Sequence, residues 1–84
     1  MSVVARPVDP QAALGEAVRQ LRVERGITQE DLAHDAQITT STLSVIERGA
    51  SNPGWATVRR IARALDVSPA ELATLAERIE KRGA

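Results

Sequence analysis

The stretch from Thr28 to Gly49 constrains the fold more than any other part of the chain, because it predicts two short helices and a tight turn between them. Thr28 can cap a first helix over about residues 28–36, and Asp31 can complete a capping box three positions later. A second helix is predicted over about residues 40–48, and Gly49 ends it.

The apolar residues of these two helices point toward one small core. Leu32 and Ala33 face inward on the first helix, and Leu43 and Ile46 lie three residues apart on the second. Thr39 or Thr40 can cap the second helix, and Thr40, Ser41, Ser44 and Val45 fall on its outward side. Two helices that share a core and expose a short polar second helix form a helix-turn-helix.

Composition limits the possible functions. The chain has 84 residues and no Cys, Phe or Tyr, so it forms one domain with a small aliphatic core and neither a disulfide nor a cysteine-based zinc site. No apolar run approaches the roughly 20 residues that span a bilayer. We therefore expect a cytoplasmic protein without a membrane segment, metal, cofactor or catalytic residue, since the single histidine has no partner for a site.

The charge balance is neutral, with eleven basic and eleven acidic residues. DNA-binding domains usually carry a basic excess, so the net charge alone does not point to nucleic acid. Ten of the eleven cations are arginine, the better residue for bidentate phosphate contact. A neutral protein can still bind DNA when a dimer aligns two local basic rims, and such binding depends strongly on salt.

The rest of the chain predicts an N-terminal arm over residues 1–9 and a domain over residues 10–80. Further helices are expected over about 10–25, 55–65 and 69–80, and the last begins with the capping sequence Ser68-Pro69-Ala70-Glu71. Trp55 is expected as a core or interface anchor. Three arginines of the helix over 55–65 are expected to face outward: Arg59, Arg60 and Arg63.

Several motifs in register resemble the phage repressor and Cro family, often called the XRE family. They are Thr28-Gln29, Leu32-Ala33 and Ile46-Glu47-Arg48-Gly49, continued by Asn52-Pro53 and by Ile61 to Leu65. The likeness covers roughly residues 12–75. It implies an all-α, five-helix, lambda-repressor-like fold and a DNA-binding transcriptional regulator, as in repressors, controller proteins of restriction–modification systems and antitoxins.

The helix over 40–48 is the candidate recognition helix, because a helix of this size enters the major groove with its N-terminal residues on the base edges. The residues expected to face bases are Thr39, Thr40, Ser41, Ser44 and Val45. Helix capping alone explains one or two of these hydroxyls. The family often has Arg, Lys or Gln here; their absence shifts specificity toward DNA shape and water.

The resemblance also implies backbone contacts and a structural pair. The phosphate-contacting candidates are Gln29, Arg48, Ser51 and Asn52. Gln29 can instead orient a side chain of the recognition helix, and the loop can be an ordinary turn. Arg22 is expected to pair with Glu47 as a structural clamp. Gln37 stands where the family commonly has Gly, so it either accepts a positive φ or changes the turn.

The family commonly dimerises through its last helix, so a homodimer on double-stranded DNA is expected. The candidate interface residues are Leu72, Leu75, Ala76 and Ile79. Alternatively, this stripe only closes the monomer core, and the arm is a loosely ordered terminus. A rival interpretation is an antitoxin or protein-interaction module with a protein partner, in which the helix-turn-helix is secondary.

Overall fold

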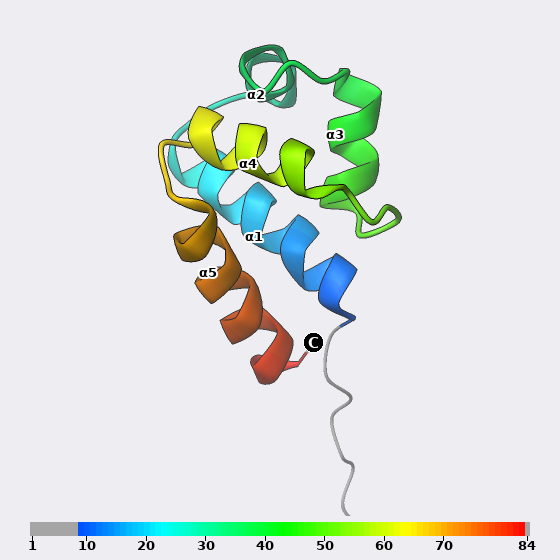
Figure 1. Ribbon diagram of the computed structural model, residues 1–84, viewed down its shortest axis with the longest axis vertical. Coiled ribbons are helices and arrows are strands. Elements are labelled where there is room, and N and C mark those ends of the chain that lie inside the picture. The colour runs from blue at the N-terminus through cyan, green and yellow to red at the C-terminus, as the bar shows by residue number, and fades with distance from the viewer. Residues whose placement is uncertain (1–8, 84) are drawn as a thin grey trace, which may run out of the picture.

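The computed structural model describes residues 9–83 and shows an all-α fold of five helices over that range (Figure 1). The fold class predicted from the sequence is therefore confirmed. The predicted arm lies outside the described residues, apart from Asp9. The helices are α1 (Pro10–Glu24), α2 (Gln29–Asp35), α3 (Thr40–Glu47), α4 (Trp55–Ala64) and α5 (Pro69–Arg82).

Side-chain caps start four of these helices. Asp9, Thr28, Thr39 and Ser68 each accept a hydrogen bond from a backbone N–H of the first turn. At Ser68 the capping box is complete, because the Glu71 side chain accepts from the Ser68 N–H at 3.1 Å. At Thr28 only the bond from the Asp31 N–H is formed among the described residues, so the capping box expected there is half complete.

Four helix ends share one backbone geometry with a residue at positive φ. Gly26 and Gly49 end α1 and α3 at φ 67° and 74°, which costs glycine nothing. Gln37 and Asp66 end α2 and α4, and both have φ 59°. The next residue donates backward in the same way at each end, as Ile38 N–H does to the Ala33 carbonyl. Gln37 therefore adopts the left-handed conformation.

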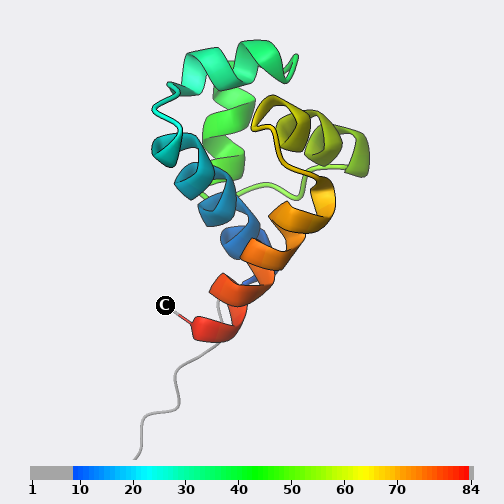
Figure 2. The ribbon, with the colours of Figure 1, turned by 90° about the vertical axis from the view of Figure 1, so that its left-hand side faces the viewer.

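The core lies between all five helices, each of which contributes buried apolar side chains. Figures 1 and 2 show α1 running through the middle of the molecule with α5 beside it and α2 and α3 at the other end. The largest fully buried side chains of the core are Val18, Leu32, Leu43, Ile46, Ile61, Leu65 and Leu72. None of the helices within residues 9–83 is long and apolar enough to cross a bilayer.

Glycine lets α1 approach the end of α3 closely. A Cβ atom on Gly15 would overlap the Ile46 carbonyl oxygen and lie 2.9 Å from that of Glu47. A Cβ on Gly49 would lie 2.6 Å from the Ala12 Cα. The two backbones touch directly at these positions, so the C-terminal end of α3 is held against α1 without intervening side chains.

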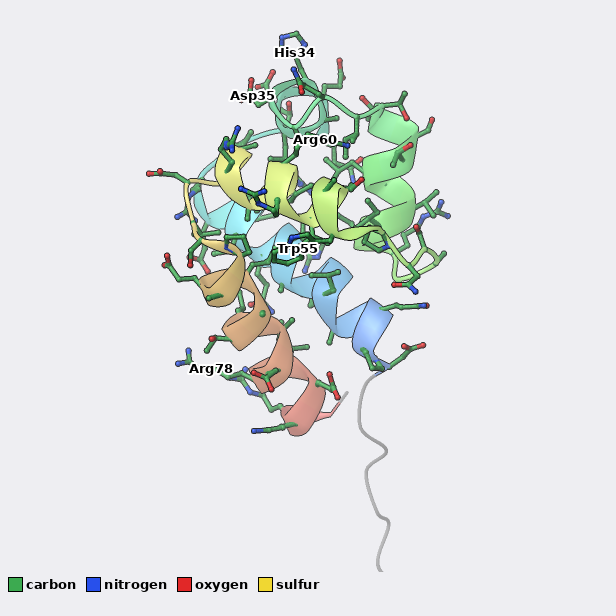
Figure 3. All side chains as sticks on the ribbon, in the orientation of Figure 1. His34, Asp35, Trp55, Arg60 and Arg78 are labelled. Carbon is green, nitrogen blue, oxygen red and sulfur yellow. The ribbon has the colours of Figure 1, made fainter. Side chains whose placement is uncertain are left out.

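The structure narrows three expectations about side-chain placement. Leu72 and Ile79 are buried inside the monomer, because α5 packs them against α1, so they are not free for a second subunit. Trp55 is 64% exposed at the start of α4, so it does not anchor the core, and its expected role at an interface stays a prediction (Figure 3). Arg60 is only half-exposed; its Nε donates to the Ala36 carbonyl at 3.2 Å and links α4 to the end of α2.

The last helix is also longer than predicted. It continues through Arg82 instead of ending near residue 80, and basic residues occupy its last turn. Cations there favourably oppose the partial negative charge of the helix C-terminus. Arg78, on the preceding turn, points away from the body of the molecule in Figure 3.

Candidate nucleic-acid interface

The inner face of α3 is held by a buried ion pair. The Arg22 Nε donates to Glu47 Oε2 at 2.7 Å, and Arg22 Nη2 donates to Glu47 Oε1 at 3.0 Å. Glu47 is 7% exposed, the one charged residue buried in the described part of the chain. This two-pronged contact joins α1 to the last residue of α3.

Two further hydrogen bonds extend this pair to α2. The Arg22 Nη1 donates to the Ile27 carbonyl at 3.0 Å, and the Gln29 Nε2 donates to Glu47 Oε1 at 2.9 Å. We call Arg22, Gln29 and Glu47 the clamp. Since every polar group of the buried carboxylate is engaged, the clamp fixes the orientation of α3 relative to α1 and α2.

This geometry bears on Gln29, which the resemblance placed at the DNA backbone or beside a recognition-helix side chain. The structure places its amide nitrogen on Glu47, while the residue itself stays half-exposed at the start of α2. Its neighbours Glu30 and Asp31 are exposed acids in the first turn. The negative charges of those acids would repel a phosphate at this end of α2. The geometry therefore favours a role for Gln29 in orienting Glu47.

The outer face of α3 carries short, uncharged side chains. Thr40, Ser41 and Thr42 are exposed, and Ser44 and Val45 are half-exposed. Four of these residues were expected to face bases; Thr42 was not.

Capping explains only part of this hydroxyl cluster. The Thr39 hydroxyl accepts from the Thr42 N–H at 3.0 Å and lies 2.8 Å from the Thr42 hydroxyl. These bonds account for Thr39 and Thr42. The hydroxyls of Thr40 and Ser41 make no hydrogen bond within the described residues, so they are free to bind a partner.

The loop after α3 returns beside the outer face. Ser51 lines a hollow of about 250 Å³ together with Ser41, Thr42 and Val45. Ser51 was expected at the phosphates, and Thr42 was not among the expected contacts. Helical spacing could have indicated Thr42, because it lies three residues before Val45 on the same side of α3.

The remaining phosphate candidates follow α3 in the chain. Arg48 is exposed, and its Nε donates to the Ser44 carbonyl at 3.3 Å, which leaves its terminal nitrogens free of partners in the described structure. Asn52 is exposed in the loop. A cation and an amide therefore come directly after α3, at positions suited to contacts with the DNA backbone.

His34 lies apart from the residues expected to contact DNA. It is exposed on α2, where Figure 3 shows it pointing away from the rest of the molecule beside Asp35. Within residues 9–83, no group of three or more His, Asp or Glu side chains is placed to hold a metal ion.

Comparison with known proteins identifies the class to which this fold and this surface belong. A family model described as a helix-turn-helix domain matches residues 13–75. An HTH-type transcriptional regulator of Sinorhizobium fredii, y4dJ, is 37% identical over 67 residues, which cover 80% of this chain and 87% of that protein.

Solved structures agree with this assignment. The clp gene regulator ClgR from Corynebacterium glutamicum has a TM-score of 0.85 and 27% identity, over 92% of this chain and 99% of that one. The restriction–modification controller protein C.Esp1396I, solved as a tetramer with its natural 35-base-pair operator, has a TM-score of 0.81 over 88% of this chain and 97% of that one. At 24% identity the latter shows the fold alone.

The chain therefore belongs to the helix-turn-helix domain family of transcriptional regulators, of the XRE type that includes phage repressors and controller proteins. It is a DNA-binding protein and not an enzyme.

Proposed function

We propose that this regulator binds, as a homodimer in the cytoplasm, a near-palindromic operator in double-stranded DNA. One α3 helix enters the major groove of each half-site, and the half-site centres lie about 10–10.5 base pairs apart. The base-facing residues are Thr39, Thr40, Ser41, Ser44 and Val45. The residues at the phosphates are Arg48, Ser51 and Asn52, with Gln29 acting chiefly on Glu47.

One observation carries this proposal: the contrast between the two sides of α3. The clamp and the contact at Gly15 hold the inner side, while the outer side presents the hydroxyls of Thr40 and Ser41, which make no hydrogen bond within the described residues. A rigid helix with an exposed polar face is suited to base contacts, since a fixed helix loses little conformational freedom on binding.

The dimer surface needs residues that the monomer leaves exposed. Among the candidates from the sequence, Leu75 and Ala76 are half-exposed and remain available. Trp55, which the sequence suggested as a core or interface anchor, joins them, because an exposed indole is a common anchor of protein interfaces. C.Esp1396I assembles as a tetramer on its operator, and an assembly of this kind on DNA fits the proposal.

Selection of bound DNA from a random duplex pool at about 0.15 M salt tests the proposal. We expect enrichment of a two-fold site with half-sites one helical turn apart. Enrichment of a single half-site would contradict the dimer. An absence of enrichment, with weak and steeply salt-dependent binding, would favour the rival function as a protein-interaction module, to which the neutral net charge also points.

A matched pair of substitutions tests the dimer surface. Trp55 and Val23 are the two large apolar side chains that are strongly exposed within the described residues, at 64% and 54%. We expect Trp55→Ala to shift the protein toward monomer in sedimentation experiments, while Val23→Ala leaves the oligomer unchanged. Equal behaviour of the two variants would place the interface elsewhere.

A further inference from the structure

The hollow beside α3 is formed by two segments of the chain. Ser41, Thr42 and Val45 come from α3, and Ser51 comes from the loop that follows. The loop is held there by backbone, because the Ala50 N–H donates to the Val45 carbonyl at 3.1 Å. The hollow between these two segments has a volume of about 250 Å³.

The lining of this hollow is uncharged and partly apolar. No Arg, Lys, Asp or Glu contributes to it. The Thr42 hydroxyl is engaged with the Thr39 hydroxyl at 2.8 Å, so the γ-methyl group is the free end of that side chain. Val45 adds two more methyl groups. The hollow is thus lined by the methyl-bearing side chains of Thr42 and Val45 together with Ser41 and Ser51.

The chemistry of base edges narrows what this hollow can receive. Guanine is bound most specifically by Arg or Lys and adenine by Asn or Gln, and none of these residues lines it. The major groove offers one apolar group, the C5-methyl of thymine. Placing a hydrogen-bonding base edge against Val45 would leave its polar atoms unpaired, which is costly.

We propose that this hollow receives the C5-methyl group of a thymine, so that Val45 and Thr42 select a T·A pair at one position of each half-site. The methyl group enters between the two residues, and the hydroxyls of Ser41 and Ser51 contact the neighbouring polar atoms or phosphate. This inference rests on the proposed function, because it takes α3 as the helix in the major groove.

Replacement of single thymines by uracil in the selected operator is the direct test, since uracil lacks only the methyl group. One thymine per half-site should stand out. Its replacement should weaken binding roughly fourfold, the effect of burying one methylene-sized group, and replacement in both half-sites roughly fifteenfold. Uracil at other positions should change affinity by less than about twofold.

Two variants of α3 separate direct contact from DNA shape. Val45→Ala should bind thymine and uracil operators within about twofold of each other, because the methyl group no longer has its partner. Thr40→Ala is the control: Thr40 is exposed on the same helix but does not line the hollow, so this variant should keep the fourfold preference even if its affinity falls. Circular dichroism and thermal melting establish that both variants fold.

A second substitution in the DNA tests the methyl group in a different base pair. At the sensitive position, 5-methylcytosine paired with guanine should bind better than cytosine paired with guanine by the same roughly fourfold factor. No difference between the two would contradict the proposal.

The outcomes distinguish this inference from the proposed function. If selection yields an operator in which no thymine methyl matters, the inference fails and the proposed function stands. If uracil weakens the wild type and Val45→Ala equally, the methyl group acts through DNA shape and the inference is overturned. If no operator is selected, both the proposed function and this inference fail.

Discussion

The inner and outer faces of α3, a helix of eight residues, differ in burial and in hydrogen bonding. The inner face buries Leu43, Ile46 and Glu47 and satisfies its one charge completely. The outer face has no charge, and its exposed hydroxyls at Thr40 and Ser41 lack partners in the described chain. One side of α3 therefore fixes the orientation of the helix, and the other side is available to contact DNA. Substitutions can alter the two sides separately.

Breaking the clamp should give the largest change on the inner face. Arg22→Ala leaves the Glu47 carboxylate buried with Gln29 as its remaining partner, and the Arg22 and Glu47 side chains are only 15% and 3% exposed. We expect a loss of about 3 kcal/mol in the free energy of unfolding, which lowers Tm by roughly 10–20 °C. Thermal melting followed by circular dichroism measures it.

Arg19→Ala is the matched control for this variant. Arg19 lies on the same helix and pairs with Glu16, but that pair is on the surface. Its loss should change Tm only slightly. If the two arginine variants lower Tm equally, the clamp does not hold α3.

Gly15→Ala tests the direct contact between α1 and α3. Alanine favours helix over glycine by up to about 1 kcal/mol, but here its Cβ meets the backbone carbonyls of Ile46 and Glu47, which cannot move aside cheaply. We expect a net loss of about 1–3 kcal/mol in urea denaturation. Gly54→Ala, where a Cβ has open space, should have a much smaller effect. A more stable Gly15→Ala protein would mean that the two helices are not in close contact.

A substitution in the turn before α3 should stabilise the protein, in contrast to the two variants above. Gln37 has φ 59°, so Gln37→Gly relieves a cost of about 1–2 kcal/mol, less the extra freedom of glycine in the unfolded chain. The net expectation is a Tm higher by a few degrees. Asp66 has the same φ, but aspartate tolerates this conformation better, so Asp66→Gly should gain less. A lower Tm for Gln37→Gly with unchanged cooperativity would contradict this account.

The smallest effect should come from the exposed pair on α1 and should depend on pH. The hydrogen bond from Arg19 lowers the pKa of the Glu16 carboxyl below its ordinary value. The pair therefore stabilises the protein above the unfolded pKa, and this stabilisation is lost as the pH falls through the folded pKa. Glu16→Gln should lower Tm slightly at pH 7 and not at all near pH 2. A difference that grew toward acid pH would reverse the sign expected here.

Local signals predicted the elements, because they act within a few residues. The caps at Asp9, Thr39 and Ser68, and the positive φ at Gly26 and Gly49, are where short-range chemistry requires them. The departure from the family pattern at Gln37 left two outcomes open, a positive φ or a different turn, and the structure has the positive φ.

Side-chain surroundings were harder to predict. A stripe containing Leu72 and Ile79 shows that one face of α5 is covered, but not whether α1 or a second subunit covers it. The bond from Gln29 to Glu47 and the exposure of Trp55 depend on how helices distant in sequence cross. The hollow at Val45 could not be predicted from the sequence, because it depends on where the loop after α3 runs.

The division of α3 into a holding face and a DNA-contacting face is tested most directly by Ser41→Ala combined with Val45→Ala. Both residues lie on the outer face, and neither contributes to the clamp. The account predicts that the affinity for the selected operator falls at least tenfold, while Tm and the oligomeric state stay unchanged. Unchanged affinity with an intact oligomer would show that this face of α3 does not contact the DNA bases.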